Sequence, residues 1–292
     1  MKLLIGDKTN NTLRLIYDYL LNNTSEQTIW LEGRDIVNEV IIHDQIAVDT
    51  QGVRMKWNYQ GTEITPDCIS GVINLLSYLP LSLFDQFVKE DQEYAREEFT
   101  SYLLFSLNQF KNVINPPWGG SLSGYCHSLP YQWMLTQKIT EGIQVPKSFF
   151  GFTKDAPVDL YLGLNSIVSD NAFNSHFWKT GLPKSIVQDN YYLFYQRPPG
   201  TPFVIIILDN NIWIHPLGQD INHSNAIEEL REGCQILMKH YHLRLAEILF
   251  FYDEHTNSFT FGSINPSVDV RHLSRQNTPD FLKSISIILE NK

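Results

Sequence analysis

The sequence is poor in the features that would place it in a class at once. Its 292 residues include three cysteines, Cys68, Cys126 and Cys234, and these stand far apart along the chain. A disulfide framework needs more cysteines at closer spacing, and scattered thiols are typical of a reducing compartment. We therefore expect a cytoplasmic protein without disulfide bonds.

Long apolar runs and basic runs are also lacking. The apolar run Phe203–Leu208 is far shorter than the roughly 20 residues that cross a bilayer, and Asp7 interrupts the apolar start of the chain before a signal peptide could form. The formal net charge is −10 and no Lys or Arg cluster occurs. Nucleic-acid binding depends on such clusters, so the sequence predicts neither a membrane nor a nucleic-acid partner.

Common ligand and nucleophile motifs are missing as well. No glycine-rich loop is followed by Lys-Ser or Lys-Thr, which excludes a P-loop, and Gly119–Gly124 lacks the dinucleotide spacing. His240 and His242 have no cysteine pair to complete a zinc site. An enzyme of another class stays open as an alternative, using either the loop with Ser121, Ser123, Cys126 and His127 or the pair Asp269 and His272.

The first half of the chain alternates predicted strands and helices. Strands or extended pieces are expected at residues 2–5, 28–31, 40–43, 54–59, 69–75 and 113–114. Helices are expected at residues 11–21, from Asp91 as a cap to Phe110, and from about Pro130 to Gly142. This alternation favours an α/β unit.

The second half predicts antiparallel pairs with fewer helices. We expect strands at residues 158–162 and 191–195, a hairpin of residues 203–208 with 212–215, and another of residues 245–252 with 259–264. An amphipathic helix is expected at residues 225–241 and a last helix from Thr278. The chain as a whole is predicted to be α/β (α+β).

Several short motifs follow one another in a recognisable order. They are Ile73-Asn74, Asp91 with Tyr94-Ala95 and Glu98, Val113-Ile114-Asn115-Pro116-Pro117, Pro130-Tyr131-Gln132, Gly142-Ile143 with Val145-Pro146, and Ile264-Asn265-Pro266. Over nearly the whole chain this order resembles the ATP-grasp ligases, especially the microviridin-type (graspetide) branch that modifies peptides.

The resemblance implies an ATP-grasp-like fold. Its parts would be an N-terminal parallel α/β domain at residues 1–115, a linker helix with a reduced central lobe at 116–200, and a C-terminal lobe at 201–292, the latter two antiparallel α+β. It also implies a peptide or protein partner and a homodimer.

In that family two carboxylates and an Asn hold Mg²⁺ on the ATP phosphates, and basic side chains neutralise the transferred phosphate. Here Asn265 is unchanged and Glu247 stands for the first carboxylate, but Ser263 takes the place of the second. Leu129 replaces a Lys, Gln196-Arg197 replaces a Gln-Glu pair, an Arg is missing near Pro202-Phe203, and residues 158–162 hold no Lys, Lys154 being the nearest. Bound Mg-ATP would therefore lack many of the basic side chains that neutralise its phosphates and one carboxylate that holds its metal ion.

Two functional hypotheses follow from the resemblance. In the first, the nucleotide site is degenerate and the chain serves as a binding or scaffold partner in the maturation of a ribosomally synthesised peptide, without a cofactor. In the second, it is a divergent ligase that uses ATP and Mg²⁺ to join a carboxylate to an amine or hydroxyl. Glu247 and Asn265 would then hold the metal, Gln196 and Lys154 the nucleotide, and Arg197 and Arg271 would be the catalytic cations.

Overall fold

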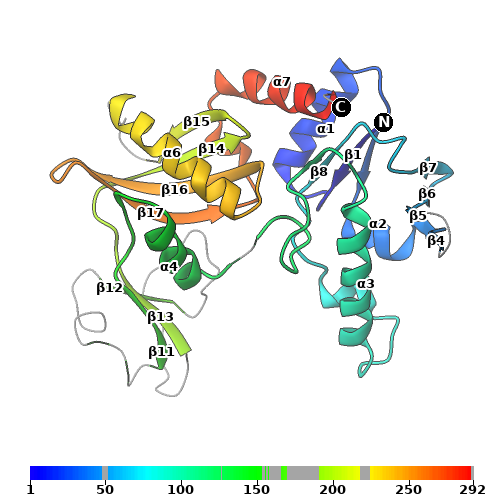
Figure 1. Ribbon diagram of the computed structural model, residues 1–292, viewed down its shortest axis with the longest axis horizontal. Coiled ribbons are helices and arrows are strands. Elements are labelled where there is room, and N and C mark those ends of the chain that lie inside the picture. Colours follow the sequence, from blue (N-terminus) through cyan, green and yellow to red (C-terminus); the bar gives the residue numbers. More distant parts are fainter. Residues whose placement is uncertain are drawn as a thin grey trace. The chain divides into compact units, whose positions relative to one another are not determined.

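The computed structural model describes residues 1–47, 52–125, 127–152, 155, 157, 166–169, 191–217 and 224–290 (Figure 1). The chain forms two compact units. The first unit contains Met1–Cys126, Tyr241–Leu245 and Pro266–Lys292. The second unit contains His127–His240 and Ala246–Asn265. In the described part of the chain, no helix combines the length and the apolarity that a bilayer crossing requires.

The first unit is built on a parallel sheet, as the sequence predicts. Its strand order is β2-β1-β8-β9, and every neighbouring pair is parallel. The strands are β1 (Lys2–Ile5), β2 (Thr28–Leu31), β8 (Gly71–Asn74) and β9 (Val113–Ile114). Nearly all their side chains are buried, as expected for parallel strands covered on both faces.

The first helices of this unit are α1 (Asn11–Asn23), α2 (Gly33–Asn38), the 3₁₀ helix η1 (Leu81–Phe84) and α3 (Gln92–Leu107). Helices α1 and α3 begin and end largely where the sequence predicts, whereas α2 and η1 were not predicted. The Asn10 side chain caps α1 by accepting the N–H groups of Thr12 and Leu13. Asp91 is the N-cap residue of α3, as expected, but its backbone is helical rather than extended and its side chain makes no capping hydrogen bond.

Short antiparallel strands complete the first unit. They are β3 (Ile41–Ile42), β4 (Gln45–Ala47), β5 (Gly52–Arg54), β6 (Trp57–Tyr59) and β7 (Thr62–Ile64), joined as β3-β6-β7 and β4-β5. The single extended piece expected at residues 54–59 is therefore two strands, β5 and β6, that belong to different sheets.

The part of the second unit that the structure describes contains two sheets. A five-stranded sheet has the order β10-β17-β16-β14-β15, and β11-β13-β12 form an antiparallel sheet of three strands. The strands are β10 (Ile143–Gln144), β11 (Ser148–Phe152), β12 (Ser166–Ser169), β13 (Tyr191–Gln196), β14 (Thr201–Leu208), β15 (Asn211–Pro216), β16 (Leu245–Asp253) and β17 (Ser258–Asn265). The predicted strand at residues 158–162 lies outside the described residues.

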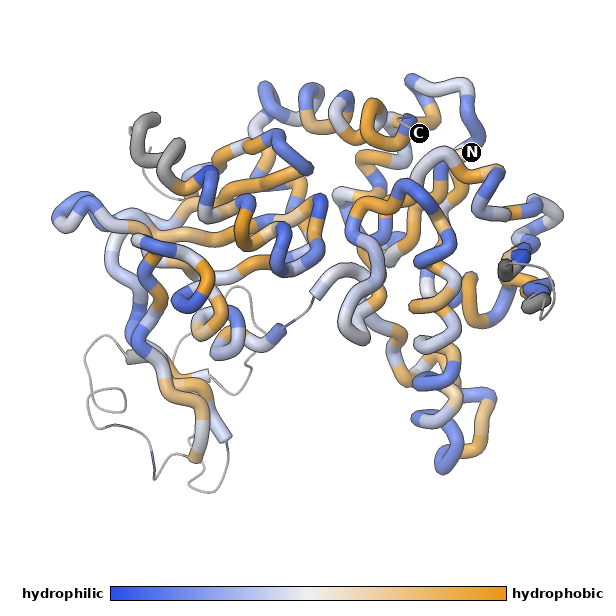
Figure 2. The backbone as a smooth tube through the Cα atoms, viewed as in Figure 1, coloured by the Kyte–Doolittle hydropathy of each residue, from blue (hydrophilic) through white to orange (hydrophobic). Residues whose placement is uncertain are grey.

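Among the described residues of the second unit, two helices are present, α4 (Leu129–Ile139) and α6 (Ser224–His240). The central strands of the larger sheet are almost entirely apolar and buried, and Figure 2 shows them in the hydrophobic colour. The predicted hairpins β14–β15 and β16–β17 are both antiparallel, which confirms the α+β character expected of this region.

The last helix, α7 (Asn277–Glu290), belongs to the first unit. The division at residues 201–292 expected from the sequence therefore differs from the grouping seen here, in which residues from Pro266 onward join the N-terminal sheet. A Cβ atom on Gly71 of β8 would lie only 2.8 Å from the Leu289 Cα atom. Asn112 also donates to the Ile288 carbonyl at 2.7 Å. Helix α7 thus packs closely against the start of β8.

Candidate functional site

Strands β16 and β17 bring together two of the predicted metal ligands. Glu247 and Asn265 are direct partners in the antiparallel ladder, and both are half-buried. Directly opposed residues point to the same face with Cβ atoms about 5 Å apart. The pairing of these two side chains, separated by a whole hairpin in the sequence, gives one carboxylate and one amide oxygen on one face.

Ser263 stands two residues earlier on β17 and is 3% exposed. It pairs with Leu249, next to a register shift in β16. Across the described residues, no group of three or more His, Cys, Asp or Glu side chains is placed to hold a metal ion. Glu247 and Asn265 alone suit a single Mg²⁺ whose remaining ligands would be water and phosphate oxygens.

Helix α4 closes the free edge of β17. Strand β10 pairs with β17 only at Phe259 and Thr260. Beyond that point the Trp133 Nε1 donates to the Gly262 carbonyl at 2.7 Å, and the Gln132 Oε1 accepts the Ile264 N–H at 2.9 Å. The Gln132 motif that supports the family resemblance therefore holds the strand that carries Ser263 and Asn265.

The start of α4 supplies no positive charge. Leu129, which stands where the resemblance implies a Lys, is 1% exposed and packs in the core. His127 lies two residues before it. Burial, reinforced by the charge of His240, lowers the pKa of His127 from its ordinary value of 6.5. His127 is therefore mostly uncharged at neutral pH and does not replace the missing cation.

Gln196 and Arg197, the predicted nucleotide-binding and catalytic pair, lie at the end of β13 and are both exposed. The chain then turns at Gly200, whose φ is +88°. A Cβ atom at Gly200 would lie 2.0 Å from the Tyr252 carbonyl oxygen, so this turn requires glycine. Lys154, the other predicted nucleotide ligand, lies outside the described residues.

Arg271, the second predicted catalytic cation, belongs to the first unit. It follows Asp269, which caps the 3₁₀ helix η4 (Val270–His272), and its guanidinium binds the Asp269 carboxylate at 2.8 and 2.9 Å. These hydrogen bonds hold the pKa of Asp269 below its usual value. The pair Asp269 and His272 therefore marks the beginning of a solvated helical turn.

The residues proposed for another enzyme class also have structural partners. Ser123 is fully buried and donates its hydroxyl to the Asn74 carbonyl at 2.7 Å. Ser121 accepts the Ser123 N–H. Cys126 lies outside the described residues. No nucleophile–base pair is recorded for these serines in the described part of the loop, where they order the turn beside Asn74.

A pocket on α3 has no counterpart in the predicted site. Its volume is about 700 Å³, and Asp91, Tyr94, Ala95, Glu98, Phe99 and Tyr102 form one wall of it. These positions follow helical spacing along one face. A sequence signal exists, because the apolar residues Ala95, Phe99 and Tyr102 recur at helical spacing within the predicted helix; what the sequence did not reveal is that they face a pocket.

Comparison with solved structures places this architecture among known proteins, although no protein-family model and no curated protein matched. The macrocyclase MdnC from Microcystis aeruginosa MRC, bound with its precursor peptide MdnA, matches 100% of both chains with a TM-score of 0.73 and 14% identity. A RiPP-associated ATP-grasp ligase from Chryseobacterium gregarium, in complex with ADP and a leader and core peptide, covers 99% of this chain and 96% of its own at TM-score 0.69 and 14% identity. The ATP-grasp ligase PsnB with minimal precursor, Mg and ADP matches 99% and 98% at TM-score 0.68 and 10% identity. At such identities the likeness concerns the fold, and this chain has the ATP-grasp fold of these peptide-modifying ligases.

Proposed function

We propose that the chain is a peptide-binding protein of the ATP-grasp fold that has lost ligation and acts as a scaffold in the maturation of a ribosomally synthesised peptide. The observation that carries the proposal is Leu129, which is buried in the core at the place where the resemblance implies a phosphate-binding Lys. Three further features support it: the buried neutral Ser263, the uncharged His127, and a fold retained over the full length of peptide-modifying relatives.

The physical argument concerns charge. A polyphosphate brings several negative charges into a cleft, and an unmatched charge is costly there because the local dielectric is low. A Leu at the Lys position loses a charge-assisted hydrogen bond worth about 1.5–3 kcal/mol. Because Ser263 stands in place of the second carboxylate, the Mg²⁺ that would accompany the phosphates also loses an anionic ligand.

The peptide part of the proposal rests on the kind of proteins that share the fold. The solved structures of MdnC, PsnB and the Chryseobacterium gregarium ligase each contain a precursor, leader or core peptide. In this chain the motif residues that support the resemblance, Asn74, Asn115 and Gln132, bond to backbone groups and preserve the frame. A chain that keeps the residues that hold the fold together, and lacks the charged residues of the nucleotide site, fits a binding role.

Calorimetric titration of the full chain with Mg-ATP tests the proposal. We expect no saturable binding up to about 1 mM, a concentration that corresponds to about −4.1 kcal/mol. We also expect no phosphate release in the presence of a synthetic peptide library. Micromolar binding with peptide-dependent phosphate release would overturn the proposal.

One observation favours the second candidate, a divergent ATP-dependent ligase. Glu247 and Asn265 are retained as cross-strand partners on one face, which is the minimum donor set for a Mg²⁺ ion on phosphates. Gln196, Arg197, Lys154 and Arg271 are its proposed nucleotide-binding and catalytic residues. This candidate predicts that Asn265→Ala and Glu247→Gln abolish ATP turnover, whereas the scaffold proposal predicts no turnover to lose.

A further inference from the structure

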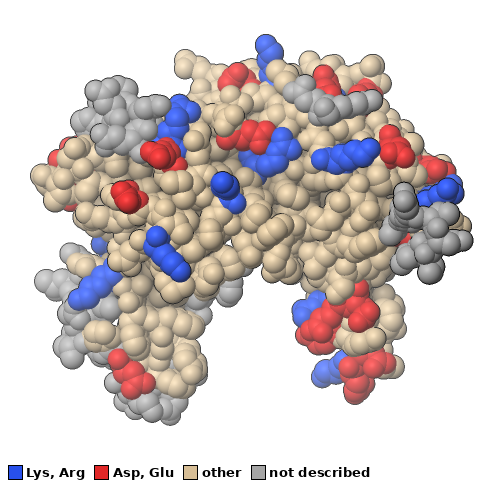
Figure 3. Space-filling view, viewed as in Figure 1, with Lys and Arg blue, Asp and Glu red and all other residues tan. Residues whose placement is uncertain are grey.

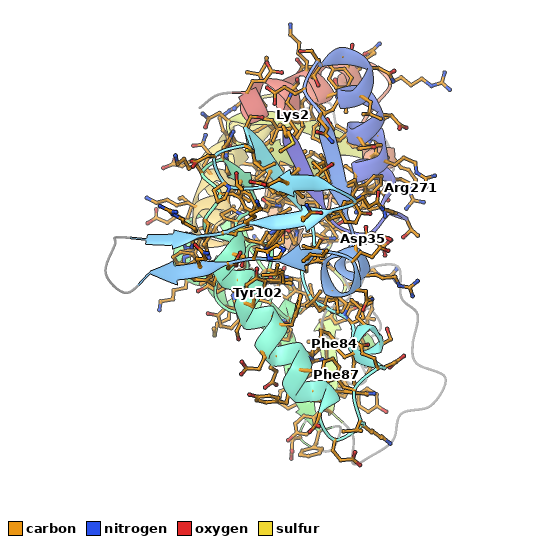
Figure 4. All side chains as sticks on the ribbon, turned by 90° about the vertical axis from the view of Figure 1, so that its right-hand side faces the viewer. Lys2, Asp35, Phe84, Phe87, Tyr102 and Arg271 are labelled. Carbon is orange, nitrogen blue, oxygen red and sulfur yellow. The ribbon has the colours of Figure 1, made fainter. Side chains whose placement is uncertain are left out.

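The pocket on α3 lies wholly within the first unit and is formed by four elements. Helix α3 contributes Asp91, Tyr94, Ala95, Glu98, Phe99 and Tyr102, which we call the α3 face. Opposite walls come from Val37 of α2 and Ile42 of β3, and Phe84 and Phe87 come from η1 and the turn after it. In Figure 4, Phe84 and Phe87 lie beside α3, and Tyr102 lies further along the helix. A volume of about 700 Å³ is in the range of ligand-binding pockets.

The deep part of the pocket is apolar and well ordered by contacts. Phe84 is 1% exposed and packs its ring edge-on against Phe99 at 6.2 Å between centroids. The Tyr102 hydroxyl accepts from Trp57 at 2.7 Å and donates to Asp44 at 2.8 Å. Burial raises the pKa of Tyr102 to about 12, so it remains uncharged. The floor therefore suits an aliphatic or aromatic side chain.

Two carboxylates interrupt this apolar lining. Asp91 stands at the N-cap of α3 but makes no capping hydrogen bond. Glu98 lies seven residues on, two helical turns along the same face. Among the described residues, no hydrogen bond or ion pair is recorded for either carboxylate, whereas the neighbouring Glu93 is paired with Arg96. Figure 3 shows acidic side chains gathered at the part of the molecule that α3 forms.

The rim of the pocket extends the apolar surface into solvent. Tyr94 is 66% exposed and Phe87 44% exposed, and Val88, next to Phe87 in the chain, is 64% exposed. Contiguous exposed apolar groups of this kind mark interaction sites more often than plain surface. The rim of the pocket therefore leaves large apolar side chains open to solvent, where a partner would cover them.

We propose that the α3 pocket binds a peptide segment that carries an aliphatic or aromatic side chain next to Lys or Arg. The apolar side chain would fill the floor at Phe84 and Phe99, and the cation would lie between Asp91 and Glu98. The exposed ring of Tyr94, on the same face, adds a surface on which a cation stacks favourably. An amphipathic helical segment meets all three requirements at once.

This inference rests on the proposed function for a peptide as the partner, but its site is independent of nucleotide. The proposed loss of ligation is tested by the Mg-ATP titration, and the pocket is tested without ATP. An active ligase that still binds a basic peptide on α3 would overturn the former and leave the latter standing.

Fluorescence polarisation with three labelled helical peptides provides the test. The first peptide presents Leu and Phe on one face flanked by Lys and Arg; the second replaces Lys and Arg by Glu; the third replaces Leu and Phe by Ser. We expect saturable binding of the first peptide only. The double variant Asp91→Asn, Glu98→Gln should weaken that binding about tenfold, and added salt should weaken it in the wild type more than in the variant.

Glu97→Gln is the matched control, because Glu97 is an exposed carboxylate on α3 that does not line this pocket. It should bind the first peptide like the wild type. Equal losses in Glu97→Gln and the double variant would overturn the proposal, as would equal binding of the acidic peptide. So would self-association that Tyr94→Arg abolishes in sedimentation, since the occupant would then be a second copy of the chain.

Discussion

Asn115 follows strand β9 in a left-handed conformation, with φ 59°, and is fully buried. Its amide donates to the carbonyls of Leu245 and Pro266 at 2.8 and 3.3 Å, and its Oδ1 accepts the N–H groups of Arg244 and Leu245, both at 2.9 Å. One side chain thus satisfies backbone groups from segments more than a hundred residues away. Asparagine tolerates this backbone conformation better than most residues.

We predict that Asn115→Ala lowers the free energy of unfolding by about 3–5 kcal/mol, because several buried backbone groups lose their partner. Urea unfolding followed by circular dichroism measures the change. Asn115→Gly should cost nearly as much, which would show that the lost hydrogen bonds, and not the backbone angle, are responsible.

Asn108→Ala is the control for this prediction, since Asn108 is exposed and its side chain, among the described residues, bonds to the nearby Leu104 carbonyl alone. Its cost should stay within about 0.5 kcal/mol. A cost for Asn115→Ala no larger than that of Asn108→Ala would contradict the structural role of Asn115.

Single residues also show the limits of sequence reasoning about the site. The pairing of Glu247 with Asn265 was predictable in outline, because a strand pattern and a hairpin loop fix which residues face each other. The environment of Leu129 and Ser263 was not, because burial depends on elements that are distant in sequence. Asp91 was predicted as a helix cap, and Asp91 and Glu98 were noted as motif residues of the resemblance, but the pocket beside them was missed.

At the scale of elements, α4 determines the geometry of β17. Trp133 is 1% exposed, donates to Gly262 and packs against Tyr195 of β13 at 5.7 Å between ring centroids. The helix is therefore in contact with both sheets of the second unit through one side chain. A strand edge without a strand partner is completed here by side chains from a helix.

We predict that Trp133→Phe lowers the free energy of unfolding by about 1–3 kcal/mol, because the Gly262 carbonyl is left without its buried donor. Thermal unfolding measures the loss. Met134→Leu on the same helix is the control, since Met134 is 58% exposed, and it should leave the melting temperature nearly unchanged. Equal shifts in the two variants would show that the hydrogen bond contributes nothing.

Helices and strands in which apolar residues recur at a regular spacing were predicted, and very short elements were not. Helix α1 and strands β14 and β16 were found within a few residues, because each carries an apolar pattern of its own. Helix α2 was missed, since six residues are too few to show a helical period, and reciprocal hydrogen bonds between Glu32 and Asp35 stabilise it instead. Helix α7 was predicted as an element but not as a part of the first unit, because its partner β8 lies two hundred residues earlier.

At the scale of the whole molecule, the first strand and the last helix are joined by an ion pair. Lys2 is fully buried, and its Nζ contacts the Glu290 carboxylate at 2.9 Å. The hydrogen bond from Lys2 lowers the pKa of Glu290 from its ordinary value of 4.5. A carboxylate whose pKa is lowered by folding stabilises the protein above its unfolded pKa and loses that contribution as the pH falls through its folded pKa.

We therefore predict that Glu290→Gln destabilises the protein at pH 7 by about 1 kcal/mol, a value reduced for the half-exposed carboxylate. The difference from the wild type should shrink below pH 4.5, the ordinary Glu value, and disappear in stronger acid. Urea unfolding across this pH range measures it. Glu254→Gln, at an exposed carboxylate for which the described residues record no side-chain partner, is the control. A difference that stays constant with pH would exclude the ion pair as its cause.

The return of α7 to β8 also has a consequence for the order of synthesis. On the ribosome, strands β1 and β8 emerge long before residues 277–290, yet Leu289 covers Gly71 and Glu290 pairs with Lys2. The N-terminal sheet must therefore wait, partly uncovered, while the entire second unit is translated. Since translation proceeds at about 5–20 residues per second, the delay lasts on the order of ten seconds or more. A chaperone that shields this sheet would act in that interval.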